Sequence, residues 1–363
     1  MTVTVTDTTP GAAAVRKAGG VVIRLPRIGA SWIVRPRSVL VSLLLAAAVA
    51  AAFVVEVAFG ELDLPLPDVV RSLAGGGDPT TALVVHSLRL PRALVGLLCG
   101  AAFGVAGAVF QTLTRNPLAS PDIIGVSAGA GTVATAGLLM GIGSGLGLQT
   151  LALIGGLGAS ALIYVLAWKS GTTGYRIVLV GVGIAALCTS ATSYLLLKAG
   201  VYQAQQALMW LTGSLNARDW EHVGPLAVAL AVLLPCVVLL APWLGGLQFG
   251  DEMAKALGLP VQTARIALLA VAAALVSFAT AAAGPIAFVA LIAPQIAVRL
   301  VGVPGPALLP SALVGSFVVL AGDVAGRQLL PGTELPVGVV TGVLGAPCLL
   351  WLLGRSNRTG SGG

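Results

Sequence analysis

Two arginines, Arg89 and Arg92, stand three residues apart in the sequence RLPR, directly before a long apolar run. Residues three apart on a helix share one face, so both guanidinium groups should point the same way. Cations at the start of a helix are unfavourable beside the positive end of its dipole, which indicates that an external group uses them at an exposed outer rim. The alternative is that they anchor the helix by reaching lipid phosphates.

Residues 244–264, LGGLQFGDEMAKALGLPVQTA, form the second stretch with recognisable chemistry. Asp251 and Glu252 stand where a helix would begin, and the helix dipole favours acids there. Gly258 follows the predicted helix, as glycine commonly does at a helix end. The segment therefore predicts a short helix at the membrane surface, for which an ordinary amphipathic helix without a partner is the alternative.

Enzyme chemistry is not favoured by the rest of the chain. No Gly-x-x-x-x-Gly-Lys-Ser/Thr sequence occurs, so the chain has no P-loop to hold ATP phosphates. His86 and His222 fall at the ends of apolar runs, and no cluster of histidines and carboxylates recurs. The four cysteines lie singly within apolar runs, without the close pairing of metal sites: Cys99, Cys188, Cys236 and Cys348. We expect no catalytic residues, no metal and no cofactor.

The composition is that of a membrane protein. Apolar residues make up 57% of the chain and charged residues 9%, against ~25% charged residues in soluble domains. A membrane helix needs ~20 apolar residues, and the Gly284-Pro285 pair divides one run that is too long for a single helix. Ten spans are predicted, at 38–59, 93–113, 121–140, 150–168, 177–197, 223–243, 265–283, 284–302, 307–326 and 336–354.

Basic residues set the expected orientation, because loops rich in lysine and arginine stay in the cytoplasm. With both termini inside, fourteen of the twenty basic residues are cytoplasmic and six are outside. The net charge of +7 then reflects topology rather than nucleic-acid binding, which needs basic residues clustered on one face. We divide the chain into a basic cytoplasmic tail (1–37), a transmembrane domain (38–354) and a cytoplasmic C-terminal tail (355–363).

Six stretches together resemble one family, the FecCD/BtuC-type permease subunits of ABC importers for iron-siderophores, haem and cobalamin. They are RLPR (89–92), NPLA (116–119), GVSAGA (125–130), GDEMAKALG (250–258), GPIAFVALIAPQIAVR (284–299) and ELPVGVVTGVLG (334–345). The wording is most similar to the second membrane subunit of ferric-enterobactin importers. The resemblance implies an all-α fold of about ten transmembrane helices, the type II ABC importer permease fold, in the inner or cytoplasmic membrane.

The resemblance also implies partners and roles. The partners would be a second permease chain, either a paralogue or a second copy, two ATP-binding subunits and an extracytoplasmic siderophore-binding protein. The coupling helix would contact the ATPase through Gly250, Asp251, Glu252, Ala254, Leu257 and Gly258. The binding protein would dock on Arg89, Arg92 and Arg327. The translocation path would include Thr189, Ser190, Thr192 and Ser193, with Met209 and Trp210 at an outer gate.

The residue roles, the cargo and the class of transporter each have alternatives. Hydroxyl groups in membrane helices often only bond to their own backbone, and interfacial aromatics explain Trp210 without a gate. Gln295 stands where many family members have histidine, and Arg299 comes one residue later than usual. The expected cargo is a ferric siderophore, with a catecholate favoured and cobalamin or haem as rivals. A secondary transporter is disfavoured because no acid pair for ion coupling lies within the spans, and a scaffold without a transport cycle is the remaining alternative.

Overall fold

Helices dominate the computed structural model, which describes residues 14–17, 20–25, 30–60, 65–73, 75–76, 78–141, 145–168, 174–302, 305–329 and 334–359. Within these ranges seven helices are long and apolar enough to cross a membrane, and three shorter apolar helices accompany them. They correspond one to one with the ten predicted spans. The ten are α1 (Pro36–Ala58), α4 (Leu90–Thr114), α6 (Val126–Leu139), α7 (Gly145–Ala167), α8 (Gly174–Lys198), α10 (Trp220–Leu247), α12 (Val261–Ala283), α13 (Val289–Val301), α14 (Leu308–Gln328) and α15 (Val337–Thr359).

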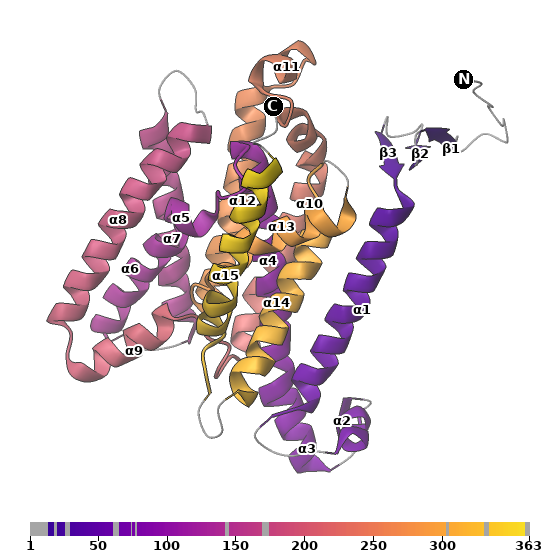
Figure 1. Cartoon of the computed structure of the whole chain (residues 1–363). Coiled ribbons are helices and arrows are strands. Elements are labelled where there is room, and N and C mark those ends of the chain that lie inside the picture. The colour runs from indigo at the N-terminus through magenta and orange to yellow at the C-terminus, as the bar shows by residue number, and fades with distance from the viewer. Residues whose placement is uncertain are drawn as a thin grey trace.

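The short elements gather at the two ends of the bundle (Figure 1). One end carries α11 (Asp251–Ala256) and the N-terminal strands, and the other carries α2 (Leu66–Leu73), α3 (Pro79–Leu83) and α9 (Val201–Leu211). A π-helix, η1 (Val84–Arg89), joins α3 to α4, and α5 (Pro121–Ile124) precedes α6. This distribution agrees with the orientation expected from the basic residues, which puts α11 inside and α9 outside.

The tail before α1 contains a small antiparallel sheet that we did not predict from the sequence. Its strands are β1 (Ala14–Lys17), β2 (Gly20–Leu25) and β3 (Ala30–Val34), in the order β1-β2-β3. Segments such as GVVIRL and ASWIV are rich in the branched and aromatic residues that favour strands. The all-α prediction is confirmed for the membrane-spanning part, while residues 1–13 and 360–363 of the two predicted tails lie outside the described ranges.

The predicted break between the seventh and eighth spans is confirmed. Helix α12 ends at Ala283, and Gly284 follows with a φ of 77°. Pro285 cannot continue the helical hydrogen bonds because it has no N–H group. The next helix begins only at Val289, after Phe288, whose φ of 65° is left-handed. Residues 284–288 therefore form an elbow inside the bundle, and α13 is shorter than the predicted span.

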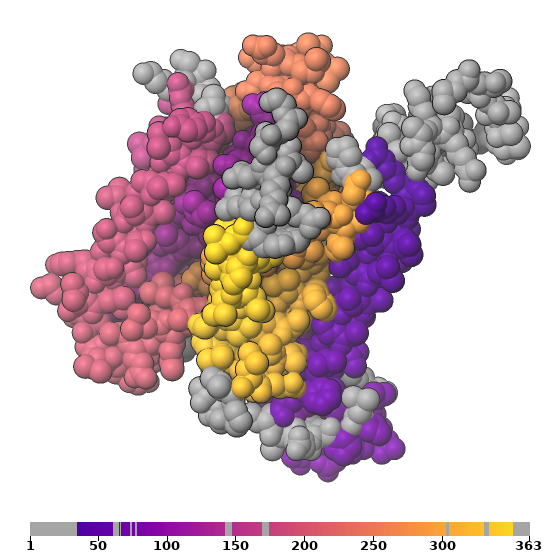
Figure 2. Space-filling view, in the orientation of Figure 1, coloured from indigo at the N-terminus to yellow at the C-terminus, as the bar shows by residue number. Residues whose placement is uncertain are grey.

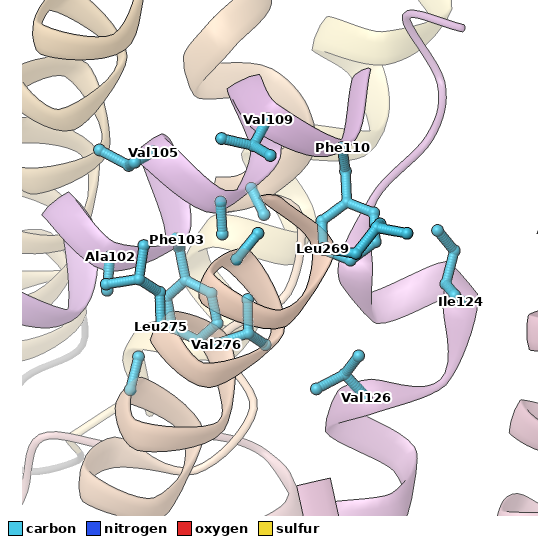
Figure 3. Packing of buried hydrophobic residues seen from close by; sticks show 14 of the residues in the cluster. Ala102, Phe103, Val105, Val109, Phe110, Ile124, Val126, Leu269, Leu275 and Val276 are labelled. Atoms are coloured by element: carbon cyan, nitrogen blue, oxygen red, sulfur yellow. The ribbon is translucent and has the colours of Figure 1, made fainter. Parts of the chain in front are cut away.

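Helix α4 lies at the centre and is packed through glycines. A Cβ atom on Gly100 would overlap the backbone of Gly315 in α14, and one on Gly107 would overlap the carbonyl of Ala290 in α13. Close backbone approach replaces the missing hydrophobic drive between helices in lipid. On another side, Phe103 of α4 packs against Leu275 and Val276 of α12 (Figure 3).

Candidate functional sites at the two ends of the bundle

The outer end of the bundle holds a cluster of charged groups from four segments. Arg92 on α4 pairs with both carboxylate oxygens of Asp323 on α14, at 2.8 and 3.1 Å. It also lies 3.4 Å from Glu334, which precedes α15. Arg327 on α14 pairs with Glu56 on α1 at 2.5 Å and with Asp323 at 3.5 Å. Three carboxylates therefore surround two guanidinium groups.

Arg89 caps a helix. Its guanidinium donates to the carbonyl oxygens of Val57 and Ala58 at 3.1 and 2.7 Å. Arg327 donates to the carbonyl oxygen of Phe59 at 2.9 Å. These carbonyls belong to the last turn and end of α1, where intrahelical partners are lacking and the dipole is negative. Arg89 and Arg327 therefore stabilise the end of α1.

Burial changes the interpretation of these arginines. The Arg92 and Arg327 side chains are only 14% and 10% exposed, and Arg89 is buried. From the sequence, we expected them to be exposed at a rim. That expectation of exposure is wrong because carboxylates far apart in the sequence fold around them. The role of these arginines in docking a partner stays a prediction. Their pairing with Glu56, Asp323 and Glu334 was not predicted from the sequence.

The inner end presents α11, whose ends are fixed by glycines. Gly250 precedes the helix with a φ of 97°, and Gly258 follows it with a φ of 77°. The N–H of Gly258 donates to Lys255 and that of Leu259 donates to Ala254, which closes the helix in a Schellman motif. A side chain at either glycine would be strained, so both are needed to set the short helix off from α10 and α12.

Two carboxylates at the start of α11 have different surroundings. Asp251 pairs with Arg265 on α12 at 2.7 Å, and Arg265 is buried. Glu252 is exposed, whereas Ala254 is buried beneath the helix. Asp251 therefore fixes α11 to α12, and Glu252 is available to a partner.

Exposed apolar side chains cover the free surface around α11. Phe249, Met253 and Leu257 are 71%, 55% and 61% exposed. Met253 and Leu257 lie one helical turn apart and share one side of α11, whereas Phe249 precedes the turn at Gly250. The segment protrudes from the bundle and is visible at the top of Figure 2. From the sequence we predicted Leu257 but not Phe249 or Met253, although the spacing of four between Met253 and Leu257 was a usable signal.

The predicted path residues lie on one helix, α8. Thr189 and Ser193 are exposed and bond to carbonyls one turn back, as the open alternative for them stated. Thr192 hydrogen-bonds Thr132 of α6 at 2.9 Å, while Ser190 is exposed. Their role in a path stays a prediction.

The predicted gate residues lie at the C-terminal part of α9. Met209 is 63% exposed, whereas Trp210 is buried. Both line an outer cavity of about 320 Å³, whose polar side chains are Gln206, Ser214, Asn216, Arg218 and Glu334. Although burial alone would raise the pKa of nearby Asp219, hydrogen bonds from His222 and from backbone N–H groups lower it. Asp219 thereby remains charged as the N-cap of α10.

Gln295 has a structural role in this chain. Its amide donates to the side chain of Gln111 on α4 at 2.6 Å, and Gln111 donates to the carbonyl of Leu291 at 2.9 Å. Arg299 donates to the carbonyl of Gln295 at 3.1 Å. These bonds satisfy both the oxygen and the N–H group of the Gln111 amide between α4 and α13, where unpaired polar groups are costly.

Comparison with known proteins gives consistent results. A model of the FecCD transport family matches residues 23–355. The chain is 38% identical to the ferric enterobactin transport system permease protein FepG of Escherichia coli (strain K12), covering 89% of this chain and 98% of that protein. It is 38% identical to the Fe(3+)-citrate import system permease protein YfmE of Bacillus subtilis (strain 168), covering 87% and 95%. A solved metal-chelate type ABC transporter in an inward-facing conformation superposes with a TM-score of 0.77 at 28% identity, covering 87% and 99%.

The charged cluster leads to a prediction about stability. Arg92→Ala should lower the free energy of unfolding by about 3–5 kcal/mol, because it leaves buried carboxylates without their partner. Arg71→Ala is the matched control, since the Arg71–Asp68 pair is exposed and such pairs contribute about 0–1 kcal/mol. Denaturation of the purified protein in detergent measures both. Equal, small losses would contradict the cluster's structural role.

Proposed function

The chain belongs to the FecCD transport family, and we propose that within it the protein imports ferric siderophores across the cytoplasmic membrane. It is a multi-pass membrane permease subunit of an ABC importer, and a separate subunit hydrolyses ATP. An ATPase and a solute-binding protein are its partners in the importer. In our proposal the complex contains two permease chains and two ATPases, and this chain itself carries no cofactor.

The exposed apolar side chains around α11 are the feature that best supports our proposal that a separate ATPase subunit drives this permease. Phe249, Met253 and Leu257 face the cytoplasm by the distribution of basic residues. Three exposed apolar side chains outside the membrane-length helices are costly in water, so we propose that a protein partner covers them. Glu252 stands beside them and would orient that partner through its charge.

The cargo proposal rests on the names of the relatives, which refer to different iron chelates. One relative is a ferric enterobactin permease and another, equally identical to this chain, is a Fe(3+)-citrate permease. A ferric chelate is common to both. Within that class a catecholate siderophore is our preferred cargo because of the sequence wording described above, and ferric citrate is the first alternative to be tested beside it.

Uptake by cells tests the cargo. A strain lacking this chain should lose import of iron-55-labelled ferric enterobactin, and plasmid-borne wild-type protein should restore it. Ferric citrate, haem and cobalamin are measured in parallel. Loss of ferric citrate uptake alone would replace the catecholate with citrate, whereas normal uptake of every ferric chelate would overturn the siderophore proposal.

Coupling to the ATPase is tested on the exposed apolar surface. Met253→Ala combined with Leu257→Ala should sharply reduce ATP hydrolysis stimulated by the loaded binding protein, because the partner loses its apolar contact. Met140→Ala is the matched control, since Met140 is 81% exposed at the opposite end. Purified importer in lipid nanodiscs provides the measurement. Normal stimulation in the double variant would refute the coupling surface.

Docking of the binding protein is proposed at the outer charged cluster. Carboxylates of the partner would approach Arg92 and Arg327 and share them with Glu334, which is 25% exposed at the edge of the cluster. Because charges near a surface are screened over ~8 Å at physiological salt, association should slow as the salt concentration rises. Arg89 supports this surface by holding the end of α1.

Charge reversal tests the docking proposal. Arg327→Glu should slow association of the binding protein, and a lysine placed on the facing partner acid should restore part of the rate. Asp323→Asn is the control for damage to the cluster, because it disturbs the same ion pairs without placing a negative charge before the partner. Association is followed by surface plasmon resonance. Equal slowing by both variants, without rescue, would leave these arginines a structural role only.

A further inference from the structure

Helix α12 runs from α11 at the inner end of the bundle to the predicted gate at α9. Its first residues follow α11 directly, and its last residue, Ala283, lies beside the turn after α9. At 1.5 Å per residue its 23 residues are about 34 Å long, which is enough to cross the hydrocarbon layer. Much of its surface is buried, and its side chains interlock with α4 (Figure 3).

The inner end of α12 is fixed to α11. Arg265, in the second turn of α12, holds Asp251 at 2.7 Å. The linker between the helices is only four residues long, from Leu257 to Pro260, and the N–H of Leu259 bonds back to Ala254. A displacement of α11 is therefore passed to the start of α12.

Backbone hydrogen bonds help to fix the outer end of α12. The N–H of Ser214 donates to the carbonyl of Ala283 at 2.9 Å, and the N–H of Gly338 donates to that of Gly213 at 3.0 Å. Three segments meet here: the end of α12, the turn after α9, and the start of α15. We call this meeting point the outer joint.

Glycines let these three backbones touch. A Cβ on Gly213 would overlap the carbonyl oxygen of Pro285, one on Gly284 would overlap that of Trp210, and one on Gly338 would overlap that of Thr212. Backbone contacts of this kind have no side-chain rotamers that could absorb a displacement, and packed interiors transmit strain. The contact is stiff for this reason.

We propose that α12 acts as a strut that carries ATP-driven displacement of α11 to α9 at the outer mouth, with Gly213, Gly284 and Gly338 as positioning residues of the outer joint. The proposal rests on the proposed function, which assigns coupling to α11. It adds the physical route by which the outer gate responds, and it places α15 in the same moving unit as α9.

Two glycines one turn apart on α15 provide a matched test. Gly338→Ala places a methyl group into the carbonyl of Thr212, whereas Gly342→Ala places the same group into open space. Both positions lie in the same helix, so the intrinsic effect of the substitution on helix stability is shared. Only the contact at the outer joint differs between them.

The readout is the movement of α9. Spin labels at Met209→Cys on α9 and Val54→Cys on α1, both exposed, are introduced after replacement of the four free cysteines. Pulsed electron resonance measures their separation in the complete importer in nanodiscs, with and without ATP. Wild type and Gly342→Ala should show an ATP-dependent change in separation, and Gly338→Ala should lose it.

Transport in proteoliposomes supplies the second readout. Ferric enterobactin is the probe. The amount imported per ATP hydrolysed should fall by about 5-fold or more in Gly338→Ala, because about 5-fold is the lower end of the usual range of coupling between two sites. ATP hydrolysis itself should continue. A Gly338→Ala variant that matches Gly342→Ala in both readouts overturns the strut.

A further variant keeps the proposal testable if Gly338→Ala does not accumulate. Asp251→Asn acts at the other end of α12, and it should also reduce the ATP-dependent change at α9. A normal change in this variant overturns the strut. Failure of the proposed coupling is distinguished by the Met253/Leu257 double variant, since normal ATPase stimulation there refutes the role of α11 whatever happens at the outer joint.

Discussion

The structure depends on the close approach of helix backbones to α4. In lipid there is no hydrophobic drive to bring helices together, so packing and satisfied polar groups must hold them. Gly100 and Gly104 let α14 touch α4, and Gly107 lets α13 do so. The hydrogen bond between Gln295 and Gln111 also joins α13 to α4, and Gln111 donates to the carbonyl of Leu291.

Arginines hold the least buried helix to this core. Most of α1 faces outward, since only 6% of its apolar window is buried. Its outer end is held by Arg89 and Arg327, and its inner end by Arg37, which donates to the carbonyl of Leu300 on α13. Arg327 thus satisfies the end of α1 and, together with Arg92, gathers three carboxylates near the outer surface. In the proposed docking role, the chain's own acids would hold Arg92 and Arg327 in place for the partner.

The two faces of the protein have different physical characters. The inner face offers an apolar surface beside one exposed acid, which suits a partner that stays bound, because apolar contact is little affected by salt. The outer face offers charges near the surface, which suit repeated association and release because such contacts mainly set encounter rates. This difference fits the proposed roles, in which an ATPase contacts the inner face and a binding protein contacts the outer face.

The sequence by itself determined the membrane class, the ten apolar helices, the break at Gly284-Pro285 and the short helix between Gly250 and Gly258. These features depend on local composition and on residues with restricted or unusual backbone freedom, so they can be read along the chain. Tertiary structure alone decided that Arg92 and Arg327 are buried among carboxylates and that Arg89 caps α1. It also decided that Gly213, Gly284 and Gly338 meet. Those contacts join segments up to about 270 residues apart, and no local pattern records which acid or carbonyl will face a given side chain once the helices pack.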